Sequence, residues 1–243
     1  MGSEVSRKGE TAQVKKWTEE EILLWAYRLE GREPQEILRW MVKEFGEDVI
    51  LASSFGAEDV VLIDMLQKIS PKVPIFYLDT NKHFRETYET RDRLQKRYNT
   101  TFIQVLPELT LEQQKEEHGD KLWEKNPNLC CEIRKVRPLS RILSRYKAWI
   151  TGIRRDQAPT RAHAKKLEWD DKFQLVKCNP LASWKSEDVW SYIRAHDIPY
   201  NPLHDRGYPS IGCEVCTRPV GPGEDPRAGR WAGFDKTECG LHK

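Results

Sequence analysis

Short apolar runs alternate with segments of helical periodicity through most of the chain, and this alternation limits the fold more than any other feature of the sequence. Residues 49–52 form a continuous apolar run of the kind found in buried parallel strands. Apolar residues at helical spacing follow over 57–66, and residues 73–78 form the next apolar run. A strand, a helix and a second strand in this order predict a βαβ unit.

Further segments of both kinds continue the alternation to about residue 198. Strands are predicted over 101–106, 148–153 and 173–178, and helices over 83–98, 129–145 and 186–196. Repeated units of this kind predict a doubly wound, mostly parallel sheet with helices on both faces. The expected fold class is therefore α/β.

Two segments flank this core. Helical patterns end at Gly31 and run again from Pro34 to Gly46. Pro and Gly are frequent after Pro199 and periodicity is lost, which predicts a loop-rich C-terminal tail. We expect one domain overall, with an N-terminal helical segment over 1–46, an α/β core over 47–198 and a loop-rich segment over 199–243.

The composition excludes several classes of protein. Forty Lys and Arg residues against 38 Asp and Glu leave a formal net charge of +2, far below that of a dedicated nucleic-acid-binding protein. No apolar run approaches the roughly 20 residues that span a bilayer. Residues 1–16 are polar and lack the apolar core of a secretory signal, so we expect a cytoplasmic protein. In a reducing compartment, six cysteines indicate metal binding or catalysis rather than disulfides.

Small and polar residues follow two of the predicted strands. Ligands of open parallel sheets bind beyond the carboxyl ends of the strands, and segment 53–59 joins such an end to a helix N-terminus. Such a turn favours a phosphate or sulfate, although the Gly-Lys-Ser/Thr ending of a Walker loop is absent. The alternative is an ordinary turn in which Glu58 and Asp59 complement the helix dipole. The next strand end, at 78–80, suits either nucleotide contacts or a plain helix cap.

Four of the six cysteines form two pairs. Cys130 and Cys131 are adjacent, and Cys213 and Cys216 form a C-x-x-C motif. Adjacent cysteines are poorly placed for a disulfide, whereas thiolates that ligate different irons of one cluster tolerate this spacing. A structural zinc held by four cysteines fits the spacing equally well. The pattern therefore predicts a metal centre and leaves iron–sulfur and zinc open.

Basic residues lie beside these motifs. Lys135 follows the first cysteine pair, where its charge would offset an anionic cluster. Arg154 and Arg161 follow a predicted strand end, and Arg230 lies in the loop-rich segment. Guanidinium groups suit phosphate and sulfate oxygens, so we expect these arginines to meet an anionic substrate. Solvated surface charge is the alternative.

Cys239 stands apart from the pairs, near the end of the chain. A thiol on a terminal segment can move between a buried site and an external reductant, so Cys239 is a candidate nucleophile. An incidental free thiol is the alternative. Cys178 lies in a predicted apolar strand and is expected in the core.

Seven motifs in a fixed order point to one family. They are SSFGAED (53–59), LDTNKHF (78–84), CCEIRK (130–135), TGIRRDQAPTR (151–161), YNPLHDRGYPSIGCEVCTRPV (200–220), GRWAG (229–233) and KTECGLH (236–242). From about residue 49 to residue 242 the chain resembles the assimilatory adenylyl-sulfate and phosphoadenylyl-sulfate reductases. The first forty-odd residues lie outside the resemblance.

The resemblance implies a nucleotide-binding core similar to the ATP pyrophosphatase (adenine nucleotide alpha hydrolase-like) fold, with 53–59 as a modified pyrophosphate loop that receives the phosphosulfate. It implies a 4Fe–4S cluster on the cysteine pairs, and members with both pairs prefer adenylyl sulfate. Cys239 would attack the sulfur, release AMP and form an S-sulfocysteine. Reduced thioredoxin or a related dithiol protein would cleave this adduct to sulfite in assimilatory sulfate reduction.

These arguments together predict a set of site residues. Cys239 is the catalytic residue, and Cys130, Cys131, Cys213 and Cys216 are the cluster ligands. The resemblance adds Lys135 and His242 as electrostatic helpers. The predicted substrate-binding residues are Ser53, Ser54, Phe55, Gly56, Ala57, Glu58, Asp59, Leu78, Asp79, Thr80, Lys135, Arg154, Arg161, Arg230 and His242.

Other activities share part of the pattern. A phosphoadenylyl-sulfate reductase, or an enzyme that uses both nucleotides, would share most of the motifs. An ATP pyrophosphatase-type enzyme that thiolates a nucleobase would share the loop and the sheet, but its loop usually reads Ser-Gly-Gly-x-Asp-Ser. A zinc-stapled interaction domain would use the four cysteines structurally. The sequence indicates no nucleic-acid or membrane partner and leaves homo-oligomer formation open.

Overall fold

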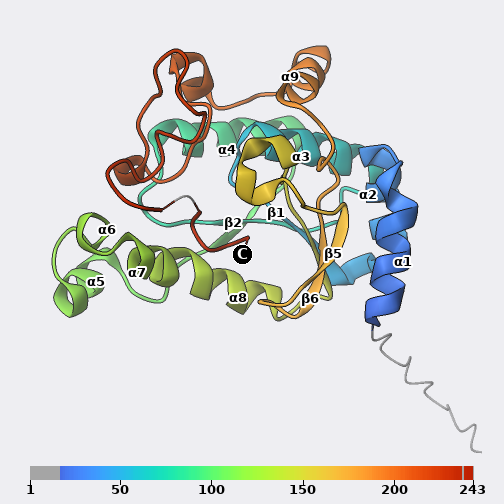
Figure 1. The fold of residues 1–243 in the computed structure, drawn as a ribbon, viewed down its shortest axis with the longest axis horizontal. Helices are drawn as coiled ribbons and strands as arrows, with labels where there is room; N and C mark the ends of the chain where they lie inside the picture. Colours follow the sequence, from blue (N-terminus) through green and yellow to red (C-terminus); the bar gives the residue numbers. More distant parts are fainter. Residues whose placement is uncertain (1–16, 237, 243) are drawn as a thin grey trace, which may run out of the picture.

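A six-stranded sheet runs through the centre of the computed structural model, which describes residues 17–236 and 238–242 (Figure 1). The strand order is β3-β2-β1-β4-β6-β5, and every neighbouring pair is parallel except β5 with β6. The strands are β1 (Val49–Ala52), β2 (Ile75–Leu78), β3 (Ile103–Val105), β4 (Ala148–Ile150), β5 (Leu167–Asp170) and β6 (Leu175–Cys178). The predicted α/β fold with a mostly parallel, doubly wound sheet is confirmed.

Helices cover both faces of the sheet (Figure 1). The described helices are α1 (Glu19–Glu30), α2 (Pro34–Phe45), α3 (Ala57–Ile69), α4 (Arg85–Tyr98), α5 (Leu111–His118), α6 (Leu122–Lys125), α7 (Pro127–Cys131), α8 (Arg137–Leu143) and α9 (Ser186–Ala195). Helices α1, α2, α3 and α9 contribute to the larger apolar cluster on one face, and α8 contributes to the cluster on the other. The core is thus split into two layers by the sheet.

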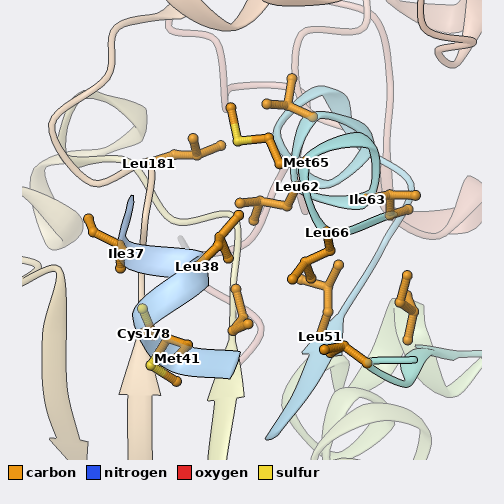
Figure 2. Close-up of a cluster of buried hydrophobic side chains, with 14 of the residues drawn as sticks. Ile37, Leu38, Met41, Leu51, Leu62, Ile63, Met65, Leu66, Cys178 and Leu181 are labelled. Atoms are coloured by element: carbon orange, nitrogen blue, oxygen red, sulfur yellow. The ribbon is translucent and has the colours of Figure 1, made fainter. Parts of the chain in front are cut away.

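Strand β1 contributes to both layers. Val49 and Leu51 belong to the larger cluster, whereas Ile50 belongs to the cluster under α8. Successive side chains of a strand point to opposite faces, so a strand covered on both sides must be apolar throughout. Figure 2 shows part of the larger cluster, in which Cys178 lies near apolar side chains of α2. The prediction that Cys178 is a core residue is confirmed, since it is fully buried.

The sequence pattern does not predict three of the elements. Helix α5 has the almost wholly polar sequence LEQQKEEH, which leaves little apolar periodicity to detect. Strand β5, with the sequence LEWD, carries two acidic residues and lies at a sheet edge, where a strand needs fewer apolar residues. Helix α6 is a single turn.

One predicted helix, over 129–145, is interrupted in the structure. It consists of α7, a π-helical segment at Glu132–Val136 and then α8. Such wide turns inside α-helices occur frequently at functional sites. The first cysteine pair therefore ends α7, directly before the π-helical segment that contains Lys135.

The two ends of the chain differ in regularity. Helices α1 and α2 fall within the predicted helical segment over 1–46, of which residues 1–16 lie outside the described residues. After α9, the described residues form two short 3-10 turns, at Pro202–Arg206 and Glu214–Cys216, and isolated β-bridges at Cys213 and between Thr217 and Arg230. Within 17–236 and 238–242, no helix has the length and apolar character needed to cross a membrane.

A buried carboxylate links three helices on the larger face. Asp64 of α3 accepts hydrogen bonds from the Tyr98 hydroxyl of α4 at 2.8 Å and from the Tyr192 hydroxyl of α9 at 2.9 Å. Lys68 Nζ lies 2.6 Å from the same carboxylate. Asp64 is only 1% exposed, so its charge depends on these donors for stabilisation.

The turn from β1 to α3 is held by its own side chains. The backbone N–H and the hydroxyl of Ser54 donate to Asp59 Oδ2, at 2.5 and 2.8 Å, and the Phe55 N–H donates to Ser53 Oγ at 3.0 Å. Phe55 adopts a positive φ of 59° and is buried against Tyr77. This packing fixes an unusual backbone conformation just before the N-terminus of α3.

Gly152, two residues beyond β4, lies against the same turn. A Cβ at this position would lie 2.5 Å from Asp59 Oδ1 and 2.9 Å from Glu58 Cβ. A larger residue would therefore push the loop after β4 away from α3. The close approach allows the loops after β1 and β4 to form adjacent walls of one site.

We expect Asp64→Ala to lower the free energy of unfolding by about 2–4 kcal/mol, because the Tyr98 and Tyr192 hydroxyls and Lys68 lose their common acceptor. Urea denaturation followed by circular dichroism measures the change. Glu89→Ala is the control, because Glu89 is the exposed partner of Arg85, and it should change the free energy by no more than about 0.5 kcal/mol. Equal effects of the two substitutions would contradict the structural role of Asp64.

A second prediction concerns Asp59, whose pKa burial raises from 3.8 to about 6 against the opposing effect of the Ser54 hydrogen bonds. The folded state therefore binds the Asp59 proton more tightly than the unfolded state. The contribution of this group to stability is largest below pH 4 and falls by up to about 3 kcal/mol as the pH rises through 6.

Asp59→Asn removes that titration. The free energy of unfolding of the variant minus that of the unaltered protein should therefore increase between pH 4 and pH 7. Urea denaturation at each pH unit measures it. A difference that stays constant over this range would show that Asp59 has an ordinary pKa in the folded protein.

Candidate active site

A cavity of about 390 Å³ lies beyond the carboxyl ends of β1, β2 and β4. Strand β1 pairs with β2 on one side and with β4 on the other. The connections that follow these neighbouring strands diverge, which leaves a crevice at this edge of the sheet. Within the described C-terminal tail, residues 238–242, the cavity is lined by Glu238, Cys239, Leu241 and His242. The predicted site residues that line this cavity are Ser53, Ser54, Phe55, Gly56, Ala57, Glu58, Asp59, Leu78, Lys135, Arg154, Arg161, Arg230, Cys239 and His242.

Asp79 and Thr80, which were expected to contact a nucleotide, do not line the cavity. Asp79 accepts hydrogen bonds from the Tyr88 hydroxyl at 2.7 Å and from Gln104 Nε2 at 2.6 Å. The Thr80 hydroxyl lies 3.3 Å from Cys213 Sγ. Both side chains therefore organise the loop after β2, and Thr80 faces the cysteines rather than the cavity.

Arg154 lines the cavity but is paired internally. Its Nε donates to Glu58 Oε1 at 2.9 Å, and its Nη1 donates to Asp156. Burial alone would lower the pKa of Arg154, but these two carboxylates raise it above its ordinary value. Arg154 therefore joins the β4 loop to α3 and adds little net positive charge to the cavity.

Arg230 is placed by close packing of the loop-rich segment. Its Nη1 donates to Ser210 Oγ at 3.0 Å, and its guanidinium lies 4.6 Å from the centroid of the Trp231 ring. A Cβ on Gly212 would lie 2.3 Å from Arg230 Nη2, so a larger residue there would displace the guanidinium. The Arg230 side chain is thus oriented before any ligand arrives.

The tail is attached on both sides of Cys239. On one side, Glu238 accepts hydrogen bonds from Arg161. On the other, Lys172 Nζ donates to the Gly240 carbonyl at 2.7 Å, and the His242 ring stacks on Trp149 with centroids 5.6 Å apart. The thiol of Cys239 is thereby held at the cavity wall.

His242 is neutral in this arrangement. Burial and the nearby positive charge of Arg161 hold the pKa of the imidazole well below its ordinary value. Its Nδ1 is buried and has no hydrogen-bond partner among the described residues. An unpaired buried nitrogen in a cavity wall is available to a ligand, because leaving it unpaired costs free energy.

Lys135 connects the main cavity to a smaller one. It lies on the π-helical segment and lines both cavities. Burial alone would lower its pKa, but the thiols of Cys213, Cys239 and Cys131 raise it. The ammonium group of Lys135 therefore interacts electrostatically with the tail thiol and with the paired cysteines at the same time.

The smaller cavity contains all four paired cysteines, Cys130, Cys131, Cys213 and Cys216. Burial, followed by repulsion from neighbouring cysteines, raises the pKa of Cys130 to about 11 and that of Cys216 to about 12. The C-x-x-C loop is fixed by the Glu214 N–H, which donates to the Lys82 carbonyl at 2.8 Å. In the described part of the chain, no three His, Cys, Asp or Glu side chains converge as ligands of a single metal ion.

The cavity wall also contains residues that were not among the predicted site residues, including Arg227, Glu238 and His204. Arg227 belongs to the basic stretch that includes Arg230, and this stretch was already expected to meet an anionic substrate. Glu238 adjoins Cys239, but nothing local indicates its arginine partners. His204 has a buried Nε2 with no hydrogen-bond partner among the described residues, which only the structure reveals.

Comparisons with known proteins agree with this geometry. Residues 48–219 match the phosphoadenosine phosphosulfate reductase domain. The chain is 52% identical over 209 residues to adenosine 5'-phosphosulfate reductase 2 of Bacillus subtilis, covering 86% of this chain and 89% of that protein. It is 49% identical over 216 residues to adenosine 5'-phosphosulfate reductase of Halalkalibacterium halodurans, covering 88% and 94%.

Solved structures give the same relationship. The crystal structure of phosphoadenylyl-sulfate reductase from Candida auris, a phosphate complex, matches with a TM-score of 0.76 and 32% identity, covering 85% of this chain and all of that one. FMN adenylyltransferase of Candida glabrata, in complex with ATP, shares the fold alone, with a TM-score of 0.56 and 17% identity over 89% of this chain and 75% of that one. The matched domain and the extent of these identities establish that the chain belongs to the phosphoadenosine phosphosulfate reductase family.

Proposed function

We propose that this protein reduces adenylyl sulfate to sulfite and AMP, with Cys239 as the nucleophile. The observation that carries the proposal is one cavity that combines a helix N-terminus, several cationic side chains and a thiol on a terminal segment. The relatives that share about half of its residues are named adenosine 5'-phosphosulfate reductases. Sulfite release from adenylyl sulfate and from its 3'-phosphorylated form, measured side by side, tests the substrate directly.

The anionic end of the nucleotide would lie between the β1–α3 turn and the cationic wall. The first N–H groups of α3 have no partners within the helix and point toward the cavity, where they favour phosphate or sulfate oxygens. Lys135 and Arg230, which line the same cavity, supply positive charge. These groups would neutralise the sulfonate as the thiolate approaches, which lowers the barrier to attack.

The first half-reaction transfers the sulfonyl group. The Cys239 thiolate attacks the sulfur, the bond from sulfur to the phosphate oxygen breaks, and AMP leaves with that electron pair. Lys135 supports the reaction because its ammonium group interacts electrostatically with Cys239 and balances negative charge at the attacking sulfur. The neutral His242 ring offers its unpaired nitrogen to a group in the cavity.

The second half-reaction requires two electrons from outside the chain. A dithiol protein such as reduced thioredoxin would attack the S-sulfocysteine, release sulfite and return Cys239 to the thiol, while the dithiol becomes a disulfide. Free thiols at the nucleophile and in the cysteine pairs need a reducing compartment, which supports the expected cytoplasmic location.

The four paired cysteines fit a 4Fe–4S cluster. They line one cavity together with cationic Lys135, and a positive neighbour suits an anionic cluster. When bound, the cluster would supply a structural and electrostatic centre beside the cavity. The electrons for sulfite formation come from thiols.

We expect one turnover without an added dithiol. Mixing the protein with adenylyl sulfate alone should yield about one AMP per active chain and a stable sulfonyl adduct on Cys239, because the covalent intermediate cannot be cleaved. Reduced thioredoxin should then release sulfite. Mass spectrometry of the C-terminal peptide identifies the modified residue.

Cys239→Ser is the matched variant. It should bind nucleotide and retain the metal centre but form no adduct, because a serine hydroxyl is far less ionised than a thiol at neutral pH. Cys178→Ser is the control, since Cys178 is buried in the core away from the cavity. Sulfite formation by Cys239→Ser, or an adduct on Cys178, would assign the chemistry to another thiol.

We further expect about four irons and four sulfides per chain after anaerobic purification, because four thiolates line one cavity. Iron and sulfide assays and the visible absorption spectrum measure the content. Cys213→Ser should lower it, whereas Cys178→Ser should leave it unchanged. One zinc per chain from an iron-replete anaerobic preparation would identify a structural zinc site instead.

A further inference from the structure

We propose that Glu238 is a positioning residue whose carboxylate fastens the tail to two arginines of the cavity wall and so holds Cys239 at the site. The inference rests on the proposed role of Cys239 as nucleophile. In this proposal, the bonds of Glu238 control how much of the time the Cys239 thiol lies inside the cavity. The contacts on both oxygens of the carboxylate carry the argument.

The Glu238 carboxylate receives four hydrogen bonds. Oε1 accepts from Arg161 Nε at 2.8 Å and from the Thr160 hydroxyl at 3.2 Å. Oε2 accepts from Arg161 Nη2 at 2.8 Å and from Arg227 Nη2 at 3.1 Å. Two parallel bonds from one guanidinium form the strongest and most directional arrangement available to a carboxylate.

The partners of Glu238 are themselves fixed. Arg161 Nη1 donates to Gln157 Oε1 at 2.6 Å, and that oxygen also accepts the backbone N–H of Arg154 at 3.0 Å. Arg161 therefore belongs to the framework of the β4 loop rather than to a mobile surface. A tail fastened to Arg161 is fastened to the same structure that forms the cavity.

The Glu238 carboxylate is buried, so its attachment depends on the opposite charges of the arginines. Glu238 is only 6% exposed. Burial acts to raise its pKa, but Arg161 and Arg227 outweigh this effect and the pKa is lowered. The residue is ionised at neutral pH, and its charge is stabilised only while the arginines face it. A neutral side chain of the same shape would lose most of this attraction.

Because Glu238 is next to Cys239 in the chain, its bonds to the arginines restrict the position of the thiol. Glu238 directly precedes Cys239, and the Lys172 bond to Gly240 directly follows it. The thiol is thus held between a charged attachment and a backbone attachment. If the ion pairs of Glu238 with Arg161 and Arg227 are removed, less holds the tail beside Cys239, and the thiol should leave the cavity more often.

The same contact should oppose the second half-reaction. Arg161 and Arg227 line the cavity that would receive the anionic nucleotide, so they face the carboxylate and the substrate together. Attachment through Glu238 favours attack by Cys239 on a bound nucleotide. Reaction with an external dithiol requires the tail to leave, and the bonds of Glu238 must then break.

Alkylation of Cys239 tests the proposal without requiring activity. The metal-loaded protein is treated with N-ethylmaleimide, and modification is followed on the tryptic peptide 237–243. Glu238→Gln should raise the rate by about tenfold, because Cys239 is half-buried while the tail is attached and becomes fully exposed when the tail opens. Glu238→Asp, which keeps the charge on a shorter side chain, should fall between Glu238→Gln and the unaltered protein.

Glu224→Gln is the matched control. Glu224 lies in the same loop-rich segment and accepts hydrogen bonds from Arg218, but both residues are exposed and lie outside the cavity wall. This substitution should leave the alkylation rate unchanged. Circular dichroism and the iron content show whether each variant is folded, and Glu238→Asp serves as the test if Glu238→Gln is not.

A second measurement separates the two half-reactions. Glu238→Gln should slow formation of AMP in a single turnover by about tenfold, whereas release of sulfite from the preformed adduct by a dithiol should not slow. Equal alkylation of Glu238→Gln and the unaltered protein would overturn the proposal, as would equal slowing of both half-reactions. Faster alkylation of Glu238→Gln in a protein that forms no AMP would support the attachment and reject the proposed function.

Discussion

Burial of β1 on both faces, with a parallel strand on each side, is the constraint on which the rest of the structure depends. Ile50 is committed to one apolar layer and its neighbours Val49 and Leu51 to the other, so the strand cannot slip by one residue without exposing apolar side chains. With β1 fixed between β2 and β4, the loops that follow these strands meet at one edge of the sheet. The cavity lies where they meet.

Charge compensation determines which cations of the cavity remain available. Arg154 is balanced by Glu58 and Asp156, and Arg161 by Glu238. The pKa of Lys135, in contrast, is raised chiefly by cysteine thiols. A list of basic residues would treat these side chains as equivalent. Their partners assign some to the framework and leave others to act on a ligand or a thiol.

The sequence predicted the fold well where local patterns decide it. A continuous apolar run such as 49–52 is typical of a strand that is buried on both faces of a sheet. Strand β5 escaped prediction because its pairing with β6 at the sheet edge, rather than its own composition, makes it a strand. The π-helical segment escaped because one wide turn leaves the apolar spacing on either side almost unchanged.

Prediction of the site followed the same division. The turn at 53–59 and the paired cysteines are local patterns, and the structure brings them to two cavities that share Lys135. Asp79 looked like a strand-end ligand, but its carboxylate is directed to Tyr88 and Gln104, which only the packing of α4 and β3 could reveal. The pairing of Glu238 with Arg161 joins residues 77 positions apart in sequence, a distance over which no periodicity gives information.

The π-helical segment at Glu132–Val136 rotates α7, which carries the first cysteine pair, relative to α8. Each residue of an α-helix advances the direction of its side chain by about 100°. Shortening the wide turn by one residue would therefore rotate Cys130 and Cys131 by that amount relative to α8, whatever residues were present. The direction in which this helix presents its thiols is thus encoded in the length of five residues and not only in their identity.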